Sequence, residues 1–365
     1  MIPPIPQPDP GPLPAPAWLL WALLMLTFFL HLVPMNLVVG GSILGAIARV
    51  RARRGDRPHD AALAHLVVKA MPVLISATVT LGVAALLFLQ VLHGRVFFAS
   101  AVVMGWWWLA VIGLLILAYY AAYLLAFREH SLGGAATLLA WLIAAIVGLI
   151  ALIYGNNMTL MLKPQELVDR YAADGRGLQL NLFDLTLIPR HLHMLLGAIA
   201  VSALAVAVAG VIRRQSAPAF ADWAVKYGAV VCGLATCLNI FAGLWWLAAL
   251  PREVLLQFMR GGMGVLGVLL AGIVLTLASA GHLVLAAGGR RQAVNVAASA
   301  GAMLAGLAMM LSTRDAVRSA SLGVAGFQPV TWTEPQWGPI LIFVVLLVVA
   351  VATVWWMVRA LAVKA

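Results

Sequence analysis

The chain has 365 residues, of which 64% are hydrophobic and only 10% are charged. This composition excludes an ordinary water-soluble enzyme, because so few polar side chains cannot cover the surface of a globule. The net charge of +11 does not indicate a nucleic-acid-binding protein, because the basic residues fall in short clusters between apolar runs. The sequence therefore predicts an all-α membrane protein, with no nucleic acid among its partners.

In chain order, residues 1–17 come first, and they are rich in proline and contain no lysine or arginine. We interpret them as an extended arm, because a cleaved secretory signal needs a basic stretch before its apolar core. Residues 18–365 then form one membrane domain. A helix needs about 20 apolar residues to cross the bilayer. Nine runs are long enough: 18–48, 62–92, 97–127, 134–154, 188–212, 223–249, 261–287, 293–312 and 338–361.

Basic side chains gather in alternate loops between these spans. The densest cluster follows the first span, and further arginines follow the third, fifth and seventh spans. Because cytoplasmic loops carry an excess of lysine and arginine, we expect the N-terminus outside (periplasmic) and the C-terminus in the cytoplasm. The long loops 155–190 and 313–337 then lie outside, with no more structure than a turn or a short interfacial helix. The sequence is typical of a multi-pass protein of the bacterial inner membrane.

Few ionisable side chains lie within the spans, and each is a functional candidate because burying it in hydrocarbon costs about 2.5 kcal/mol or more. His193 opens the fifth span and Met263 opens the seventh, both at the end expected outside. Imidazole and thioether groups on facing helices are suitable axial ligands for haem, and nearby glycines let the flat macrocycle approach the backbone. We predict that His193 and Met263 ligate a low-spin haem whose propionates are neutralised by Arg190 and Arg260.

Simpler interpretations stay open for several residues. Taken alone, Met263 is more simply a packing residue, because methionine is abundant here and glycine-rich helix starts are common in membranes. His191 lies about 200° around the helix from His193, so the two cannot ligate on one face. His65 is interpreted as a capping residue, with a quinone or proton site as the less favoured alternative, and His93 is interpreted as a surface group.

The segment before the last span resembles a motif of subunit I of the cytochrome bd quinol oxidases. It reads Gly-Phe-Gln-Pro-Val-Thr-Trp-Thr-Glu over residues 326–334. Gly326, Gln328, Pro329 and Glu334 keep the spacing of the family's GRQPW motif and of the haem-ligating glutamate that follows it.

Further parts of the chain are similar to the same family. Residues 190–193 resemble its RxxH motif, whose histidine binds the low-spin haem b, and Met263 lies where the family has that haem's methionine ligand. His31 resembles a first-helix histidine that binds a high-spin haem. The resemblance implies that His193, Met263, His31 and Glu334 are ligands of haem iron. It also implies one to three b-type haems, with room for a haem d-like site, as well as quinone or quinol and a second membrane subunit.

The chain also departs from this family. The long quinol-binding loop between helices six and seven is reduced to about residues 250–260, and GRQPW has become GFQPV. In the third span, Met104 and a residue near Ile112 stand where the family has two glutamates. These departures favour a shortened bd-like cytochrome that keeps haem without oxidase chemistry.

Three functional hypotheses follow. The favoured one is a membrane b-type cytochrome subunit of a respiratory complex, which transfers electrons between the quinone pool and a periplasmic c-type cytochrome or similar redox protein. The second is a terminal quinol oxidase that reduces oxygen to water. The third is a transporter or structural subunit without cofactor, in which His193, Met263 and Glu334 only connect helices.

Overall fold

The computed structural model describes residues 11–327 and 329–363 and shows an all-α protein. Residues 1–10 of the predicted arm and Gln328 of the motif lie outside the described residues. The helices are α1 Ala17–Arg53, α2 Pro58–Val103, α3 Gly105–Arg128, α4 Ala135–Met161, α5 Pro164–Ala173, α6 Leu187–Ile212, α7 Pro218–Ala248, α8 Arg252–Met259, α9 Gly262–Ala287, α10 Gln292–Val324 and α11 Trp337–Val363. Within the described part, all except α5 and α8 are long and apolar enough to cross a membrane, which confirms the nine predicted spans.

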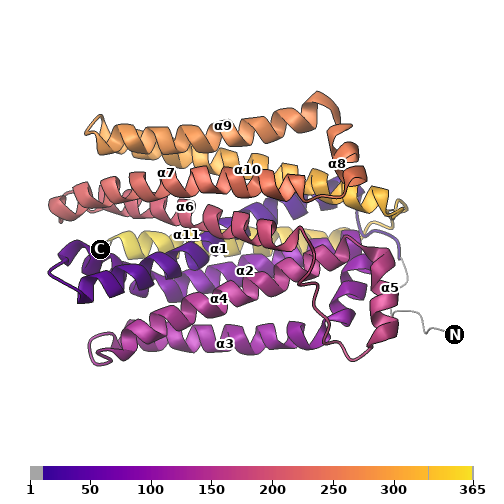
Figure 1. Ribbon diagram of the computed structural model, residues 1–365, viewed down its shortest axis with the longest axis horizontal. Coiled ribbons are helices and arrows are strands. Elements are labelled where there is room, and N and C mark those ends of the chain that lie inside the picture. The colour runs from indigo at the N-terminus through magenta and orange to yellow at the C-terminus, as the bar shows by residue number, and fades with distance from the viewer. Residues whose placement is uncertain (1–10, 328, 364–365) are drawn as a thin grey trace.

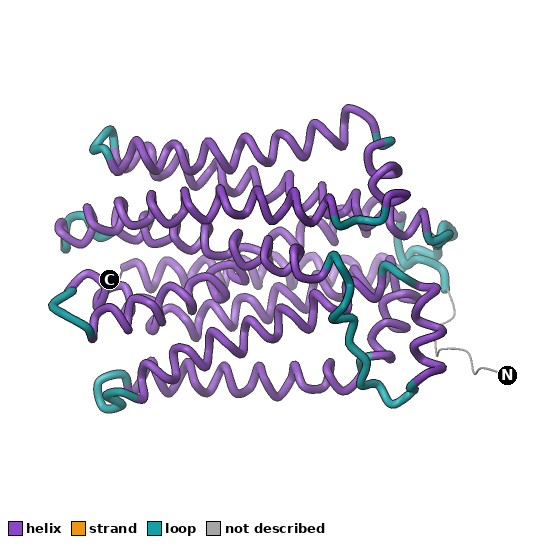
Figure 2. The backbone as a smooth tube through the Cα atoms, viewed as in Figure 1, coloured by secondary structure: helices purple, strands orange, loops and turns teal. Residues whose placement is uncertain are grey.

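The long helices lie side by side and run alternately up and down the bundle (Figure 1). We call one end of the bundle the basic end; it carries loops 54–57, 129–134, 213–217 and 288–291. The opposite end, the N-terminal end, carries residues 11–16, α5, α8 and residues 325–327 and 329–336. Figure 2 shows that the loops at the basic end are short, whereas a longer irregular segment crosses the N-terminal end between α5 and α6.

Three helical hairpins, α1/α2, α6/α7 and α9/α10, form most of the bundle, and α1 packs against α6 to join the first two. Small residues allow this close approach, as is usual for helices in membranes. At Gly40 on α1, an added Cβ atom would lie 2.1 Å from the carbonyl oxygen of Ala198 on α6. Any side chain at Gly40 would therefore push apart the two helices that carry His31 and His193.

The fourth span ends at Met161 instead of residue 154, and larger differences occur at the third and eighth spans. The third span begins at Gly105 instead of residue 97, because α2 continues to Val103 through a kink at His93, where φ is −130° and ψ is 25°. The eighth span continues to Val324, so the first half of the predicted loop 313–337 is helical. Its charged residues ended the apolar run in the sequence, but they pack against protein within the bundle.

The described part of the N-terminal arm is attached to the segment that precedes α11. The backbone N–H of Leu13 donates to the carbonyl of Trp332 at 2.9 Å, and the N–H of Glu334 donates to the carbonyl of Leu13 at 2.9 Å. Leu13 and Ala15 are buried. The arm therefore fixes the position of the segment that contains Glu334.

Candidate functional site

His193 on α6 is held by two features of α7. Its Nδ1 lies 3.0 Å from the carbonyl oxygen of Asn239, and its ring fills the space left by Gly243, where an added Cβ would come within 3.0 Å of Cε1 and Nδ1. Because a carbonyl oxygen only accepts, Nδ1 is the donor, and the neutral imidazole keeps a free lone pair on Nε2. Most metal-binding histidines are oriented by a hydrogen bond of this kind, which the ring nitrogen that does not bind the metal donates.

His31 on α1 is held by α2 in the same way. Its Nδ1 donates to the carbonyl oxygen of Thr78 at 2.9 Å, and an added Cβ at Gly82 would lie 2.8 Å from Cε1 of the ring. In both cases the glycine follows the carbonyl residue by four positions, which is one helical turn. The two imidazoles therefore share one mode of support, and each has Nε2 available as a ligand atom.

Each of these histidines also lies next to an aromatic ring, and the guanidinium group of an arginine packs on the face of that ring. The ring of His31 stacks on Phe28 with centroids 6.1 Å apart, and the guanidinium of Arg314 lies 4.5 Å from the centroid of Phe28. Such contacts between a guanidinium and an aromatic face are attractive. Arg314 comes from the part of α10 that was predicted to be a loop.

The second arrangement repeats the first with other residues. His193 lies 6.1 Å from Trp246 between ring centroids, and the guanidinium of Arg190 lies 4.7 Å from the centroid of Trp246. Only 6% of the Arg190 surface is exposed, and its Nε has no hydrogen-bond partner among the described residues. Arg190 is thus a buried cation near His193, and its predicted role of neutralising a haem propionate stays a prediction.

Arg190 and Arg314 meet at one small cavity. Its volume is about 20 Å³, room for about one water molecule. It is lined by Met158, Met161, Leu162, Arg190, Arg314 and Arg318. Arg314 and Arg318 were not predicted as site residues, although their spacing of four residues places them on one face of a helix.

The other predicted site residues lie on the surface of the described structure. Met263 is in the first turn of α9, which packs against α10 and α7, and 86% of its surface is exposed. Arg260 and Glu334 are exposed at the N-terminal end. No hydrogen bond, aromatic contact or cavity described for His193 involves Met263, so their pairing across a haem stays a prediction.

Two further histidines lie near the site. His191 is partly buried on a different face of α6 from His193, and its Nδ1 has no partner among the described residues. His93 was interpreted as a surface group, but it sits at the kink of α2, 6.5 Å from Phe327 between ring centroids, with a buried Nδ1. The interpretation of His93 as a surface group is therefore wrong, because its Nδ1 is buried.

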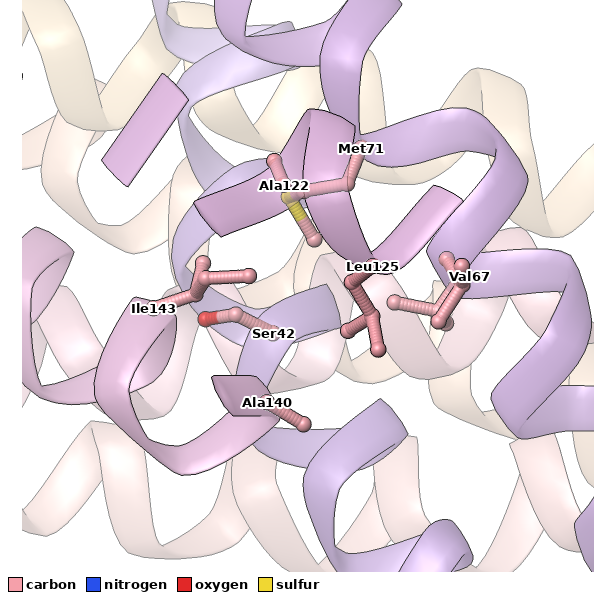
Figure 3. Close-up of a pocket in the computed structure, with 8 residues that line it drawn as sticks. Ser42, Val67, Met71, Ala122, Leu125, Ala140 and Ile143 are labelled. Atoms are coloured by element: carbon pink, nitrogen blue, oxygen red, sulfur yellow. The ribbon is translucent and has the colours of Figure 1, made fainter. Parts of the chain in front are cut away.

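A second cavity of about 20 Å³ lies among α1, α2, α3 and α4. Figure 3 shows that apolar side chains surround it, and its lining is Ser42, Val67, Val68, Met71, Ala122, Leu125, Ala140 and Ile143. The one hydroxyl, on Ser42, donates to the carbonyl of Val39. The cavity offers no imidazole or carboxylate ligand and is far smaller than a porphyrin, so we interpret it as a packing defect and not as a binding site.

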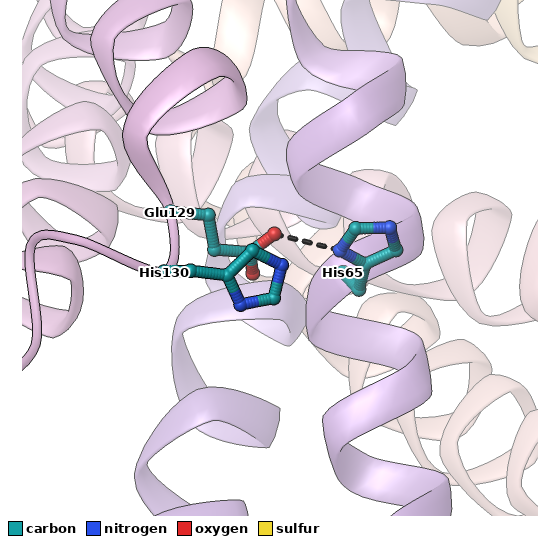
Figure 4. A group of neighbouring side chains, drawn as sticks. All are labelled: His65, Glu129 and His130. Carbon is teal, nitrogen blue, oxygen red and sulfur yellow. Dashed lines mark hydrogen bonds and ion pairs between the residues drawn. The ribbon is translucent and has the colours of Figure 1, made fainter.

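At the basic end, Glu129 is the centre of a polar group (Figure 4). It accepts hydrogen bonds from Arg49 and, at 2.6 Å, from Nδ1 of His65. The atoms of His65, Glu129 and His130 that could bind a metal ion lie within 4.8 Å of one another. Because Arg49 already occupies one carboxylate oxygen and its charge opposes a cation, we interpret the group as an ion-pair network.

Lys69, one helical turn after His65, donates a hydrogen bond to the carbonyl of Ala126 at 2.8 Å.

This network predicts a pH-dependent contribution to stability. Burial alone would raise the pKa of Glu129, but the hydrogen bonds from Arg49 and His65 lower it below its usual value. Glu129→Gln is expected to destabilise the protein by about 2 kcal/mol at pH 7, since hydrogen bonds to charged groups contribute roughly that much. The difference from wild type is measured as Tm in detergent. It should begin to shrink as the pH falls below about 4.3, the usual pKa of glutamate in an unfolded chain, and should be gone below the lowered pKa of the folded protein. At that pH the wild-type carboxyl group is neutral as well.

Glu253→Gln is the control, because Glu253 is exposed on α8. A Tm difference for Glu129→Gln that stays constant across this pH range would contradict the ion-pair interpretation.

Comparison with known proteins supports the fold. No family model matches the sequence, and no curated protein matches it. Among solved structures, the chain is similar to a chain in the structure of the bd oxidase from Geobacillus thermodenitrificans, with a TM-score of 0.69 over 96% of this chain and 100% of that chain. The two are 14% identical in sequence. The resemblance seen in the sequence is thus confirmed at the level of the fold.

Proposed function

We propose that this protein is a membrane b-type cytochrome subunit that transfers electrons through haem. One observation carries the proposal: His31 and His193, on neighbouring helices, are each held through Nδ1 to a backbone carbonyl, against a glycine of the adjacent helix. A packing histidine needs no such glycine space, whereas a metal-binding histidine needs a fixed tautomer and a free Nε2.

The residues around the two imidazoles fit a haem. Imidazole is a common axial ligand, and bound haem would supply reversible one-electron chemistry. The chain contributes the ligand atoms of His31 and His193, burial within the bundle, and the positive charges of Arg190 and Arg314. Met263 and Glu334 are proposed as further ligands on the sequence resemblance alone, and their exposure leaves them accessible to a group bound at the surface.

The fold supports the wider proposal, in which electrons pass between quinone and a periplasmic redox protein at the bacterial inner membrane. In this proposal the N-terminal end faces the periplasm, because the basic end carries the arginine clusters. Much of α3, α9 and α11 is exposed, and these helices are available to lipid or to a second membrane subunit.

Oxidase chemistry is less well supported. The resemblance aligns two acidic residues with Met104, which directly precedes α3 and is completely buried, and with a position near Ile112 on α3, whose side chain is 59% exposed on the outside of the bundle. Neither can carry a proton toward an oxygen-reducing centre.

The visible spectrum of the purified protein tests the proposal. A Soret band, a low-spin α-band on reduction and a pyridine haemochrome ratio of two or more haems per chain are expected. Reduced quinol should reduce the haem, while oxygen uptake should stay at the level of a sample without protein. A spectrum without a Soret band would mean that the histidines only connect helices, and rapid oxygen uptake would identify an oxidase instead.

A further inference from the structure

The cavity lined by Arg190, Arg314 and Arg318 contains more positive charge than the residues around it neutralise. Arg318 pairs with Asp315, whose carboxylate also accepts a 2.7 Å hydrogen bond from Trp21. No ion pair within the described residues involves Arg190 or Arg314. Two guanidinium groups therefore lie without a counter-ion at a place where an unpaired charge is costly.

A second acid that acts on Arg190, Asp184, cannot supply the missing charge. Asp184 precedes α6, but it forms a 2.9 Å ion pair with Lys163 and accepts hydrogen bonds from Thr186 and Asn181. Burial alone would raise the pKa of Asp184, but the hydrogen bonds from Thr186 and Lys163 lower it, so this carboxylate is charged and already paired. Among the described residues, no carboxylate is therefore left to pair with Arg190 or Arg314, and a bound anionic group could neutralise them.

Each unpaired arginine is linked to one of the two histidines. Arg314 lies on Phe28, which stacks on His31, and Arg190 lies on Trp246, which is next to His193. Both guanidinium groups then reach the same cavity. A group bound at either histidine thus has a buried cation beside it.

We propose that Arg314 and Arg190 bind the propionate carboxylates of the haems assigned to His31 and His193, and that both haems turn their propionate edges toward this shared cavity. The inference rests on the proposed function. A guanidinium group matches the two oxygens of a carboxylate with two parallel hydrogen bonds, which suits propionate better than a spherical anion. The cavity is too small for a macrocycle. One carboxylate tip can replace the water-sized space between the arginines, and a second requires the arginine side chains to move apart.

The test uses the full-length haem-loaded protein with Arg314→Gln and Arg190→Gln. The midpoint potential of each haem is followed by optical redox titration, and the haem content by pyridine haemochrome. Arg314→Gln should lower the potential of the haem that is lost in His31→Ala, and Arg190→Gln should lower that of the haem lost in His193→Ala. The reason is that a nearby positive charge favours the reduced, less positive iron. If a glutamine variant instead loses the one haem that is assigned to its neighbouring histidine, this outcome supports the proposal as well.

Two controls make the assignment specific. Arg252→Gln removes an exposed charge from the same end of the bundle and should leave both potentials unchanged. Arg314→Lys keeps the charge without the paired hydrogen bonds and should give a smaller shift than Arg314→Gln.

Three outcomes would overturn the inference. One is unchanged potentials and haem content in both glutamine variants, and another is a shift of the wrong haem. The third is a potential that changes when chloride is replaced by gluconate, because a free anion would then occupy the cavity. A wild-type protein without a Soret band would instead remove the proposed function, and this inference with it.

Discussion

Replacing His193 by alanine is expected to remove one haem from each chain and to abolish the low-spin α-band. At this position, α6 and α7 provide one imidazole whose tautomer is fixed. The 3.0 Å hydrogen bond from Nδ1 of His193 to the carbonyl oxygen of Asn239 fixes it and leaves Nε2 free to bind iron. Without the ligand, the space around Gly243 offers the haem no bond to iron. The haem-to-protein ratio should fall by one, while the protein still inserts into the membrane.

The matched variants separate ligand loss from misfolding. His31→Ala should remove a different haem, and the double variant should lose both. His191→Ala should leave the spectrum unchanged, because His191 lies on another face of the same helix. His193→Gly with added imidazole should recover the α-band, since the free ligand can occupy the vacated space. An unaltered α-band in His193→Ala would refute the assignment of His193 as a ligand.

The spans could be predicted because hydropathy depends on residues that are adjacent in the sequence. The same local signal failed at the end of α10, where Arg314, Asp315 and Arg318 looked like the start of a loop. Their charges are tolerated within the bundle because the carboxylate, the tryptophan N–H and the aromatic ring that contact them come from α1 and from α10 itself. Such contacts depend on the three-dimensional packing of α10 against α1, which no window of sequence contains.

His31 and His193 could be recognised as candidate ligands from the sequence, but the carbonyl groups and glycines that hold their rings could not. Thr78 and Asn239 contribute only backbone carbonyls, so their side chains give no indication of the role. Gly82 and Gly243 are two of 33 glycines, and nothing in their sequence context distinguishes them from packing glycines. Conversely, Met263 was predicted from its position at a helix start, but the structure leaves its side chain exposed, and the sequence could not reveal this.

The two glycines give the sharpest test of this support, because they can be changed without altering a ligand. Gly82→Ala would place a Cβ 2.8 Å from Cε1 of His31, and Gly243→Ala would place one 3.0 Å from Cε1 of His193. Real Cβ contacts are longer, so each ring must move away from its carbonyl and lose its fixed orientation. Loss of such an orienting contact typically weakens metal binding by about 10- to 100-fold.

We therefore expect Gly82→Ala to lower occupancy of the haem assigned to His31 and to leave the other haem in place, with the reverse for Gly243→Ala. The effect at Gly82 should be larger, because its predicted overlap is closer. Gly148→Ala on α4 is the control, since an added Cβ there has no atom within 4 Å. Haem titration of each variant, followed by the α-band, measures the change. Equal haem occupancy in the three alanine variants would show that the two glycines serve helix packing only and do not hold the imidazoles for binding to iron.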